Sequence, residues 1–190
     1  IWKHPDPYAE YILAADASFG RGGDYSAFHV INLYNGEQVA EFYSNKTSIS
    51  DFARVINDTG NDYNLAHVVL ERNGLGLPLI QELFENLEYE NIWMDDKQEF
   101  GFQMTTNSRE KVLSFLDEAL RTSRFRINSE RTVDELNTFV ITDTGKIEAD
   151  KGYDDDLVIS LGLAALISTE LAQGLPSEMA KGEDDTTNQQ

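Results

Sequence analysis

The strongest constraint on the fold is a long apolar segment, residues 155–168, near the end of the chain. Drawn as a helix, it is apolar on nearly every side, a pattern that is typical of a buried helix rather than of an amphipathic surface helix. Its apolar stretch, residues 157–167, is too short to span a bilayer. Such a helix needs other elements to cover it on all sides. The segment therefore predicts a helix that packs against a sheet inside a globular domain.

The first part of the chain predicts that sheet. Residues 11–15, 26–33 and 38–43 are β-like runs, and the last two are separated by Asn35-Gly36. An Asn-Gly pair between two such runs is the strongest short-range signal for a β-hairpin. We expect a three-stranded antiparallel meander at the start of the domain.

Helical and strand-like patterns then alternate. We expect strands at residues 67–70 and 91–94, with helices at residues 50–59 (stopping at Gly60), from Pro78 onward, after a capping box at Asn107 and Glu110, and at residues 131–139. This order predicts an α/β fold, with a mixed sheet of an antiparallel meander followed by parallel strands, flanked by helices. Residues 1–10 are expected to be a linker entering the domain, residues 11–174 the domain, and residues 175–190 an acidic, disordered tail.

Composition limits the possible functions. The chain has 190 residues, 41% of them hydrophobic, which suits one domain with a substantial core. It has no cysteine, which excludes disulfides, thiolate metal sites and a cysteine nucleophile. The net charge of −19 opposes binding to nucleic acid unless basic patches or metal ions offset it. The first residue is Ile1 and no secretory signal is present, so we expect a fragment of a larger protein.

Four carboxylates occupy positions that suit a metal site. Asp16 follows the first strand, Glu71 follows the strand at 67–70, and Asp155 and Asp156 open the buried helix. Functional groups gather at the carboxyl ends of parallel strands, and the start of a buried helix could join them. Clustered carboxylates repel one another unless a divalent cation lies between them. Singly, each acid also has a simpler reading, because Asp16 could begin a turn, Glu71 could form a surface ion pair and Asp155 could merely cap its helix.

Three segments around these acids resemble the nuclease motifs of large terminase subunits from tailed bacteriophages. Residues 16–27, DASFGRGGDYSA, resemble the first motif, and residues 68–73, VVLERN, are similar to the second acidic station. Residues 152–158, GYDDDLV, resemble the terminal motif Gly-x-His-Asp-Asp-Leu, with Asp154 in place of the histidine. The motifs stand in the family's order and at similar spacing.

The resemblance implies an RNase H-like fold and a metal-dependent endonuclease activity. It implies that this domain hydrolyses phosphodiester bonds of concatemeric double-stranded viral DNA during genome packaging. Asp16, Glu71, Asp155 and Asp156 would be both the metal ligands and the catalytic residues. One or two Mg²⁺ ions suit such an oxygen-only site, and Mn²⁺ could substitute.

The resemblance also implies partners. Large terminases carry an ATPase motor before the nuclease, whereas this chain has no phosphate-binding loop, since Gly145-Lys146 is followed by Ile147. The chain would thus be the excised carboxyl-terminal nuclease domain. Its partners would be double-stranded DNA, the ATPase domain, the portal protein and the small terminase subunit, in the cytoplasm of the infected bacterial host and without a membrane.

Five basic residues are candidates for DNA contact. Arg21 and Arg72 lie within the motifs that contain Asp16 and Glu71. Arg109, Lys111 and Arg124 lie within residues 105–131, a segment that contains six basic and four acidic residues. Basic side chains at these places could contact backbone phosphates. The other readings are a solvated helix face with internal ion pairs, and an Arg72 that pairs with a neighbouring acid.

Three alternatives stay open at this point. A Holliday-junction resolvase-like nuclease would prefer four-way junctions to linear duplex. A sugar kinase or actin-like ATPase shares a related fold but generally needs a second half, for which the chain is too short. A non-catalytic docking domain would use its acidic surface to bind a protein and would neither bind Mn²⁺ nor cut DNA.

Overall fold

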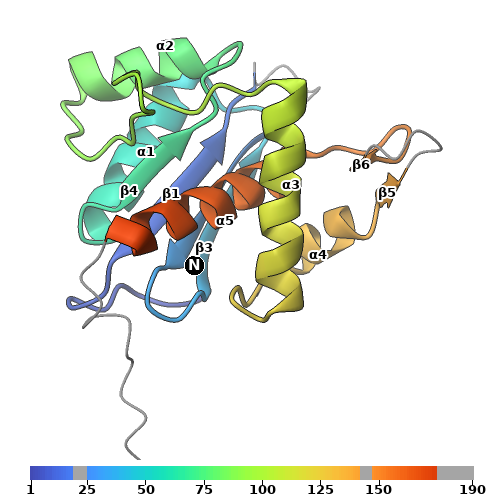
Figure 1. Cartoon of the computed structure of the whole chain (residues 1–190). Coiled ribbons are helices and arrows are strands. Elements are labelled where there is room, and N and C mark those ends of the chain that lie inside the picture. The colour runs from blue at the N-terminus through green and yellow to red at the C-terminus, as the bar shows by residue number, and fades with distance from the viewer. Residues whose placement is uncertain (19–24, 142–146, 175–190) are drawn as a thin grey trace, which may run out of the picture.

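The computed structural model describes residues 1–18, 25–141 and 147–174 (Figure 1). In chain order the elements are β1 (Tyr11–Asp16), β2 (Ser26–Asn32), β3 (Gln38–Ser44), α1 (Ile49–Asp62), β4 (His67–Leu70), α2 (Gly76–Gln81), the π-helical turn η1 (Glu82–Asn86), α3 (Thr106–Arg121), α4 (Glu130–Leu136), β5 (Phe139–Ile141), β6 (Ile147–Ala149) and α5 (Asp156–Gly174). The expected disordered tail, residues 175–190, lies outside the described residues.

The central sheet has the strand order β3-β2-β1-β4, and β5 and β6 form a separate hairpin. Strand β2 pairs antiparallel with β1 and with β3, which is the predicted meander. The turn between β2 and β3 contains Gly36 at a φ of 68°. Strand β4 pairs parallel to β1, with Ala15 opposite Leu70. The mixed sheet is therefore confirmed. Because β1 and β4 run in the same direction, the residues that follow them leave the sheet at the same edge.

Helices cover both faces of this sheet (Figure 1). Leu13 and Ala15 of β1 pack into the cluster that contains the buried side chains of α1 and α2. Ile12 and Ala14 point to the other face, into the cluster built from α3 and α5. Every residue of α5 from 156 to 168 is buried, which confirms the predicted buried helix.

Two predicted elements differ in the structure. Helix α1 continues through Gly60 to Asp62 instead of stopping at the glycine. A Cβ atom at Gly60 would lie 2.3 Å from the Tyr89 hydroxyl, so this glycine allows close packing inside the helix. The expected strand at 91–94 is replaced by two isolated β-bridges. Ile92 pairs parallel with Val68, and Met94 then pairs antiparallel with Phe100.

The start of α3 and the end of α4 also differ from expectation. The capping box of α3 is formed by Thr105 and Ser108, not by Asn107 and Glu110. Helix α4 ends at Leu136, and Phe139 at the end of the predicted helix begins the strand β5. Sequence patterns place helix boundaries only to within a few residues, because helix ends fray.

Residues 1–10 contain no regular element but are tied to the sheet and to the end of α1. The Trp2 N–H donates to the Val39 carbonyl at 2.8 Å, and the Tyr63 hydroxyl donates to the Lys3 carbonyl at 2.6 Å. Ala9 is buried. None of the described helices is long and apolar enough to cross a membrane.

Candidate metal centre

Three elements bring the four predicted carboxylates to one edge of the sheet. Asp16 is the last residue of β1, and Glu71 directly follows β4, where its N–H donates to the Ala15 carbonyl at 3.1 Å. Asp156 is the first residue of α5, which packs on β1 and β2, and Asp155 precedes it. Parallel strand ends and one helix start thus meet, as the pattern predicted.

Electrostatics show that the four groups influence one another. Burial raises the pKa of Asp16 well above its ordinary value, and the charges of Glu71, Asp156 and Asp155 raise it further. Burial also raises the pKa of Asp156 to about 7, against the opposing effect of the Tyr25 N–H, which donates to Oδ2 at 3.2 Å. The site therefore holds mutually repelling carboxyl groups, and burial disfavours their charged forms.

Arg109, from the first turn of α3, brings a positive charge to this cluster. Its Nη2 lies 2.6 Å from Oδ2 of Asp155. Burial raises the pKa of Glu71, while the Arg109 charge lowers it. Arg109 thus acts on two of the four acids, and the Asp155 carboxylate faces Arg109 rather than its own helix.

The donor set fits a hard divalent cation in the type of its ligand atoms. Carboxylate oxygens are the ligands that Mg²⁺ and Mn²⁺ prefer, and mutual repulsion among these acids would be relieved by a cation. Within residues 1–18, 25–141 and 147–174, no three His, Cys, Asp or Glu side chains already converge closely enough to cage an ion. The four carboxylates lie at the same end of the sheet but do not form a closed set of metal ligands, and Asp155 is paired with Arg109.

The predicted DNA-contacting residues are spread over different surroundings. Arg72 is only 8% exposed and forms ion pairs with Asp95 at 3.0 Å and Glu99 at 2.7 Å. Lys111 is exposed and lies 3.9 Å from Glu170, near the end of α5. Arg21 lies outside the described residues. Contact between these side chains and DNA stays a prediction.

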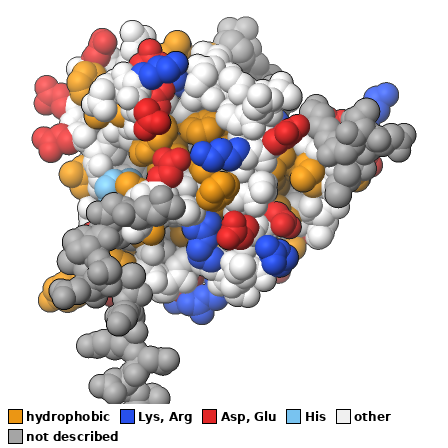
Figure 2. Space-filling view, viewed as in Figure 1, with side chains coloured by type: hydrophobic (Ala, Val, Ile, Leu, Met, Phe, Trp, Pro, Cys, Tyr) orange, Lys and Arg blue, Asp and Glu red, His pale blue; other side chains and the backbone are white. Residues whose placement is uncertain are grey.

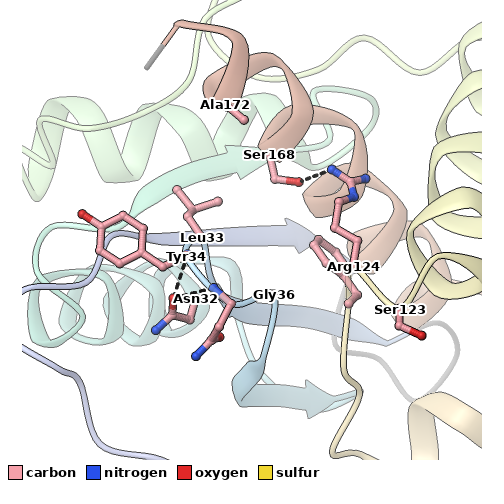
Figure 3. Close-up of a pocket in the computed structure, with 10 residues that line it drawn as sticks. Asn32, Leu33, Tyr34, Gly36, Ser123, Arg124, Ser168 and Ala172 are labelled. Carbon is pink, nitrogen blue, oxygen red and sulfur yellow. Dashed lines mark hydrogen bonds between the residues drawn. The ribbon is translucent and has the colours of Figure 1, made fainter. Parts of the chain in front are cut away.

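Arg124 lies far from the carboxylates, beside a cavity of about 310 Å³ (Figure 3). Its guanidinium donates to Thr169 Oγ1 at 2.6 Å and to the Ala165 carbonyl at 3.0 Å, in the second half of α5. The cavity is lined by Asn32, which pairs with Tyr11 at the opposite end of β1 from Asp16. Arg124 therefore does not belong to the carboxylate cluster.

The face that carries α3 and α5 mixes basic, acidic and apolar side chains (Figure 2). The described part of this face shows no continuous basic strip. An approaching phosphate backbone would meet charges of both signs there, in keeping with the chain's net charge of −19.

Sequence reasoning missed two buried residues that hold the start of α5. Glu135 of α4 is 8% exposed, and its Oε1 accepts the Val158 N–H at 2.9 Å. His29 Nε2 lies 3.0 Å from the Leu157 carbonyl, and because a carbonyl only accepts, this nitrogen donates. The available signal for Glu135 was its place three residues after Thr132, on the face of α4 that is buried.

Comparison with known proteins agrees with this geometry. A family model, the terminase RNaseH-like domain, matches residues 13–158. The large terminase subunit of Thermus virus P23-45 is 26% identical over 161 residues, which cover 82% of this chain and 31% of that protein. The large terminase subunit of Thermus phage G20c matches at the same identity and coverage. The chain thus spans about a third of the length of these curated relatives.

Solved structures share the fold. The large terminase nuclease from thermophilic phage G20c with bound cobalt superposes with a TM-score of 0.72 at 24% identity, covering 86% of this chain and 84% of that one. The large terminase nuclease domain of Thermus phage P74-26 gives a TM-score of 0.69 at 24% identity, covering 85% and 81% of the two chains. By the family model, which spans both strand-end acids and the start of α5, this chain belongs to the terminase RNase H-like domain family.

Proposed function

We propose that this chain is an endodeoxyribonuclease domain that hydrolyses phosphodiester bonds of double-stranded DNA with the help of one or two divalent ions, Mg²⁺ in the cell and Mn²⁺ as a substitute. The observation that carries the proposal is the meeting of Asp16, Glu71, Asp155 and Asp156 at one edge of the sheet. The clustering of like charges there has no stabilising role of its own.

The carboxylates that would bind an ion are held in place by different parts of the structure. Asp16 and Glu71 are fixed by adjacent strand ends, which makes Asp16 the best candidate for a central ligand. Asp156 is held by the Tyr25 N–H, whereas Asp155 is 41% exposed at its side chain and paired with Arg109. When bound, a divalent ion activates water and stabilises the charge on the leaving oxygen.

Arg109 has a second role in this proposal. A cation held by Asp155 would replace Arg109 as the partner of that carboxylate. The guanidinium would then be available, beside the site, to donate to a phosphate oxygen of the substrate. Its release also removes a competing positive charge from the ligand set.

Metal ions in similar structures support this assignment. The G20c large terminase nuclease has been solved with bound cobalt and with bound magnesium, and the SPP1 large terminase nuclease domain with bound manganese. Oxygen-only carboxylate sites accept such ions interchangeably more readily than sites with thiolate ligands.

The chain covers about a third of the length of its curated relatives, so the rest of the protein would supply the other packaging activities. We infer that the whole protein cuts concatemeric viral DNA during packaging in the cytoplasm of the infected host. There the domain would work with the ATPase domain, the portal protein and the small terminase subunit. Cationic surface on these partners would offset the domain's own negative charge.

A plasmid-nicking assay with Mg²⁺, Mn²⁺ or EDTA tests the activity. We expect metal-dependent nicking that EDTA stops and that Asp16→Asn abolishes, while Asp58→Asn, an exposed acid of α1, retains it. Unchanged metal-dependent cleavage by Asp16→Asn would overturn the assignment. A strong preference for four-way junctions would instead favour a resolvase, and absence of both Mn²⁺ binding and cleavage would favour a docking domain.

A further inference from the structure

The start of α5 is capped by another element instead of by its own first residues. The first N–H groups of a helix have no partner within the helix, and the side chain of the N-cap residue usually accepts one of them. Asp155 occupies the N-cap position, since its carbonyl accepts the Ile159 N–H at 2.8 Å. Yet the Asp155 carboxylate lies 2.6 Å from Arg109 instead of folding back onto α5. Asp156 is likewise turned away, toward the Tyr25 N–H.

Glu135 takes the bond that an N-cap aspartate normally makes. Its Oε1 accepts the Val158 N–H at 2.9 Å, at the third helical position, which is a usual target of an N-cap side chain. Burial raises the pKa of Glu135, whereas the N–H groups of Val158 and the neighbouring Leu157 lower it. A carboxylate at a helix start is further favoured by the helix dipole. The amino end of α5 is thus satisfied from α4.

The same turn is fixed on its carbonyl side by β2. His29 donates to the Leu157 carbonyl at 3.0 Å, and its other ring nitrogen lies 2.7 Å from Nε2 of Gln38, which donates to it. Two neighbouring strands of the sheet therefore set the position of this turn. Glu135 fixes the same turn through one of the turn's N–H groups, by accepting the Val158 N–H.

Packing alone does not explain a glutamate at this position. The side chain is buried, and the neighbouring charges of Asp155 and Asp154 are unfavourable for a further carboxylate. A neutral side chain would avoid that repulsion. The bond that its carboxylate accepts from the Val158 N–H indicates a specific task, which is to cap α5.

We propose that Glu135 is a positioning residue of the metal site, which caps α5 in place of Asp155 and so keeps the Asp155 carboxylate turned away from α5, toward Arg109 and the metal site. This inference rests on the proposed metal-dependent function. It goes beyond that function by assigning the orientation of Asp155 to a residue of α4 that contacts neither metal nor substrate.

Mn²⁺ titration by calorimetry, on the wild-type chain and on three variants, tests the inference. Glu135→Ala should weaken Mn²⁺ binding by about tenfold or more, as loss of a residue that orients a ligand does, because Asp155 would turn back to cap α5. Glu135→Gln keeps an acceptor oxygen and should stay within about threefold of wild type. Asp134→Ala, an exposed neighbour on α4, should bind as wild type does.

The outcomes separate positioning from general stability. Wild-type Mn²⁺ affinity in a folded but less stable Glu135→Ala would show a merely structural role and overturn the inference. An equal loss in Glu135→Gln and Glu135→Ala would assign the effect to the charge and overturn the capping account. If Glu135→Ala fails to fold, Glu135→Asp provides the same test, since it keeps the charge and loses the reach.

A metal-free crystal structure of Glu135→Ala, or of Glu135→Asp in its place, separates this inference from the proposed function. We expect the Asp155 carboxylate on the Val158 N–H and away from Arg109. Asp155 still paired with Arg109 would overturn the inference even if the wild type binds metal. Conversely, a capping Asp155 together with a wild type that binds no Mn²⁺ would uphold the positioning and reject the metal-dependent function.

Discussion

The charged groups near the two ends of β1, Arg124 and Asp16, lie in opposite electrostatic surroundings. At the Tyr11 end, burial lowers the pKa of Arg124, but hydroxyl and carbonyl acceptors of α5 surround its guanidinium (Figure 3). At the Asp16 end, burial raises the pKa of the carboxyl group and the nearest acids raise it further. The first end is electrostatically satisfied and serves stability. The second is left unsatisfied, which is the condition expected of a site that awaits a cation.

The greatest change should come from the loss of a proposed metal ligand at the unsatisfied end. Glu71→Gln removes a charged oxygen donor with almost no change in shape. We expect plasmid nicking in Mg²⁺ to fall at least about a hundredfold, by analogy with the loss of a group that stabilises developing charge. Far-ultraviolet circular dichroism should remain as in wild type. A rate within threefold of wild type would remove Glu71 from the site.

Metal binding should depend on pH with a defined sign. The pKa of Asp156 is raised to about 7, so below pH 7 this group holds a proton that it must lose before it can bind an ion. Mn²⁺ affinity should therefore increase from pH 6 to pH 7 by up to about tenfold for one released proton, and then level off. Titration calorimetry in buffers of different ionisation enthalpy measures the proton release. Affinity that is independent of pH over this range would contradict the picture of a proton-holding cluster.

At the satisfied end, the expected effect is on stability alone. Arg124→Ala removes the donors to the Ala165 carbonyl and the Thr169 hydroxyl, and these acceptors lose their hydrogen bonds to the guanidinium. We expect a loss of about 1 kcal/mol in the free energy of unfolding, which is a fall of roughly 2–4 °C in Tm for a domain of this size. Nicking per folded molecule should be unchanged. A selective loss of DNA cleavage in Arg124→Ala would instead support the predicted DNA contact.

A second effect on stability, of similar size, has the opposite direction. Asp16→Asn removes a carboxyl group whose raised pKa shows that its charged form is disfavoured in the folded state. The folded state therefore loses stability as pH rises above the ordinary pKa of an aspartate, and the substitution should restore part of it. We expect a Tm higher by a few degrees at pH 8 without metal, and a smaller gain at low pH. Differential scanning calorimetry at two pH values measures it, and a lower Tm at both would contradict the expectation.

The sequence was most informative where local pattern and topology act together. The alternation of buried residues, the Asn-Gly turn and the apolar α5 predict the sheet and its layers, and parallel pairing then places Asp16 beside Glu71. Arg72 shows the limit. It follows Glu71 directly, yet its ion pairs depend on Asp95 and Glu99, whose return to this edge no local pattern indicates.

The capping of α5 was hidden for a similar reason. A sequence pattern predicts that Asp155 caps its own helix, because it considers only neighbours along the chain. The structure supplies a competing acceptor from α4 through tertiary packing. Gly60 is a comparable case, since Tyr89, far along the chain, decides whether the glycine ends a helix or lets two elements approach closely.

The burial of α5 from residue 156 to residue 168 has a consequence for how the carboxylate cluster forms. The two strand-end acids are separated from the acids at the start of α5 by more than eighty residues of chain, and closing such long-range contacts is a slow part of folding. Until α5 docks, Asp16 has neither Asp155 nor Asp156 beside it. A chain interrupted before α5 during synthesis would therefore hold only two of the four clustered carboxylates and would have an uncovered sheet face. Such a product would be prone to aggregation, and under the proposed function it would lack a complete metal site.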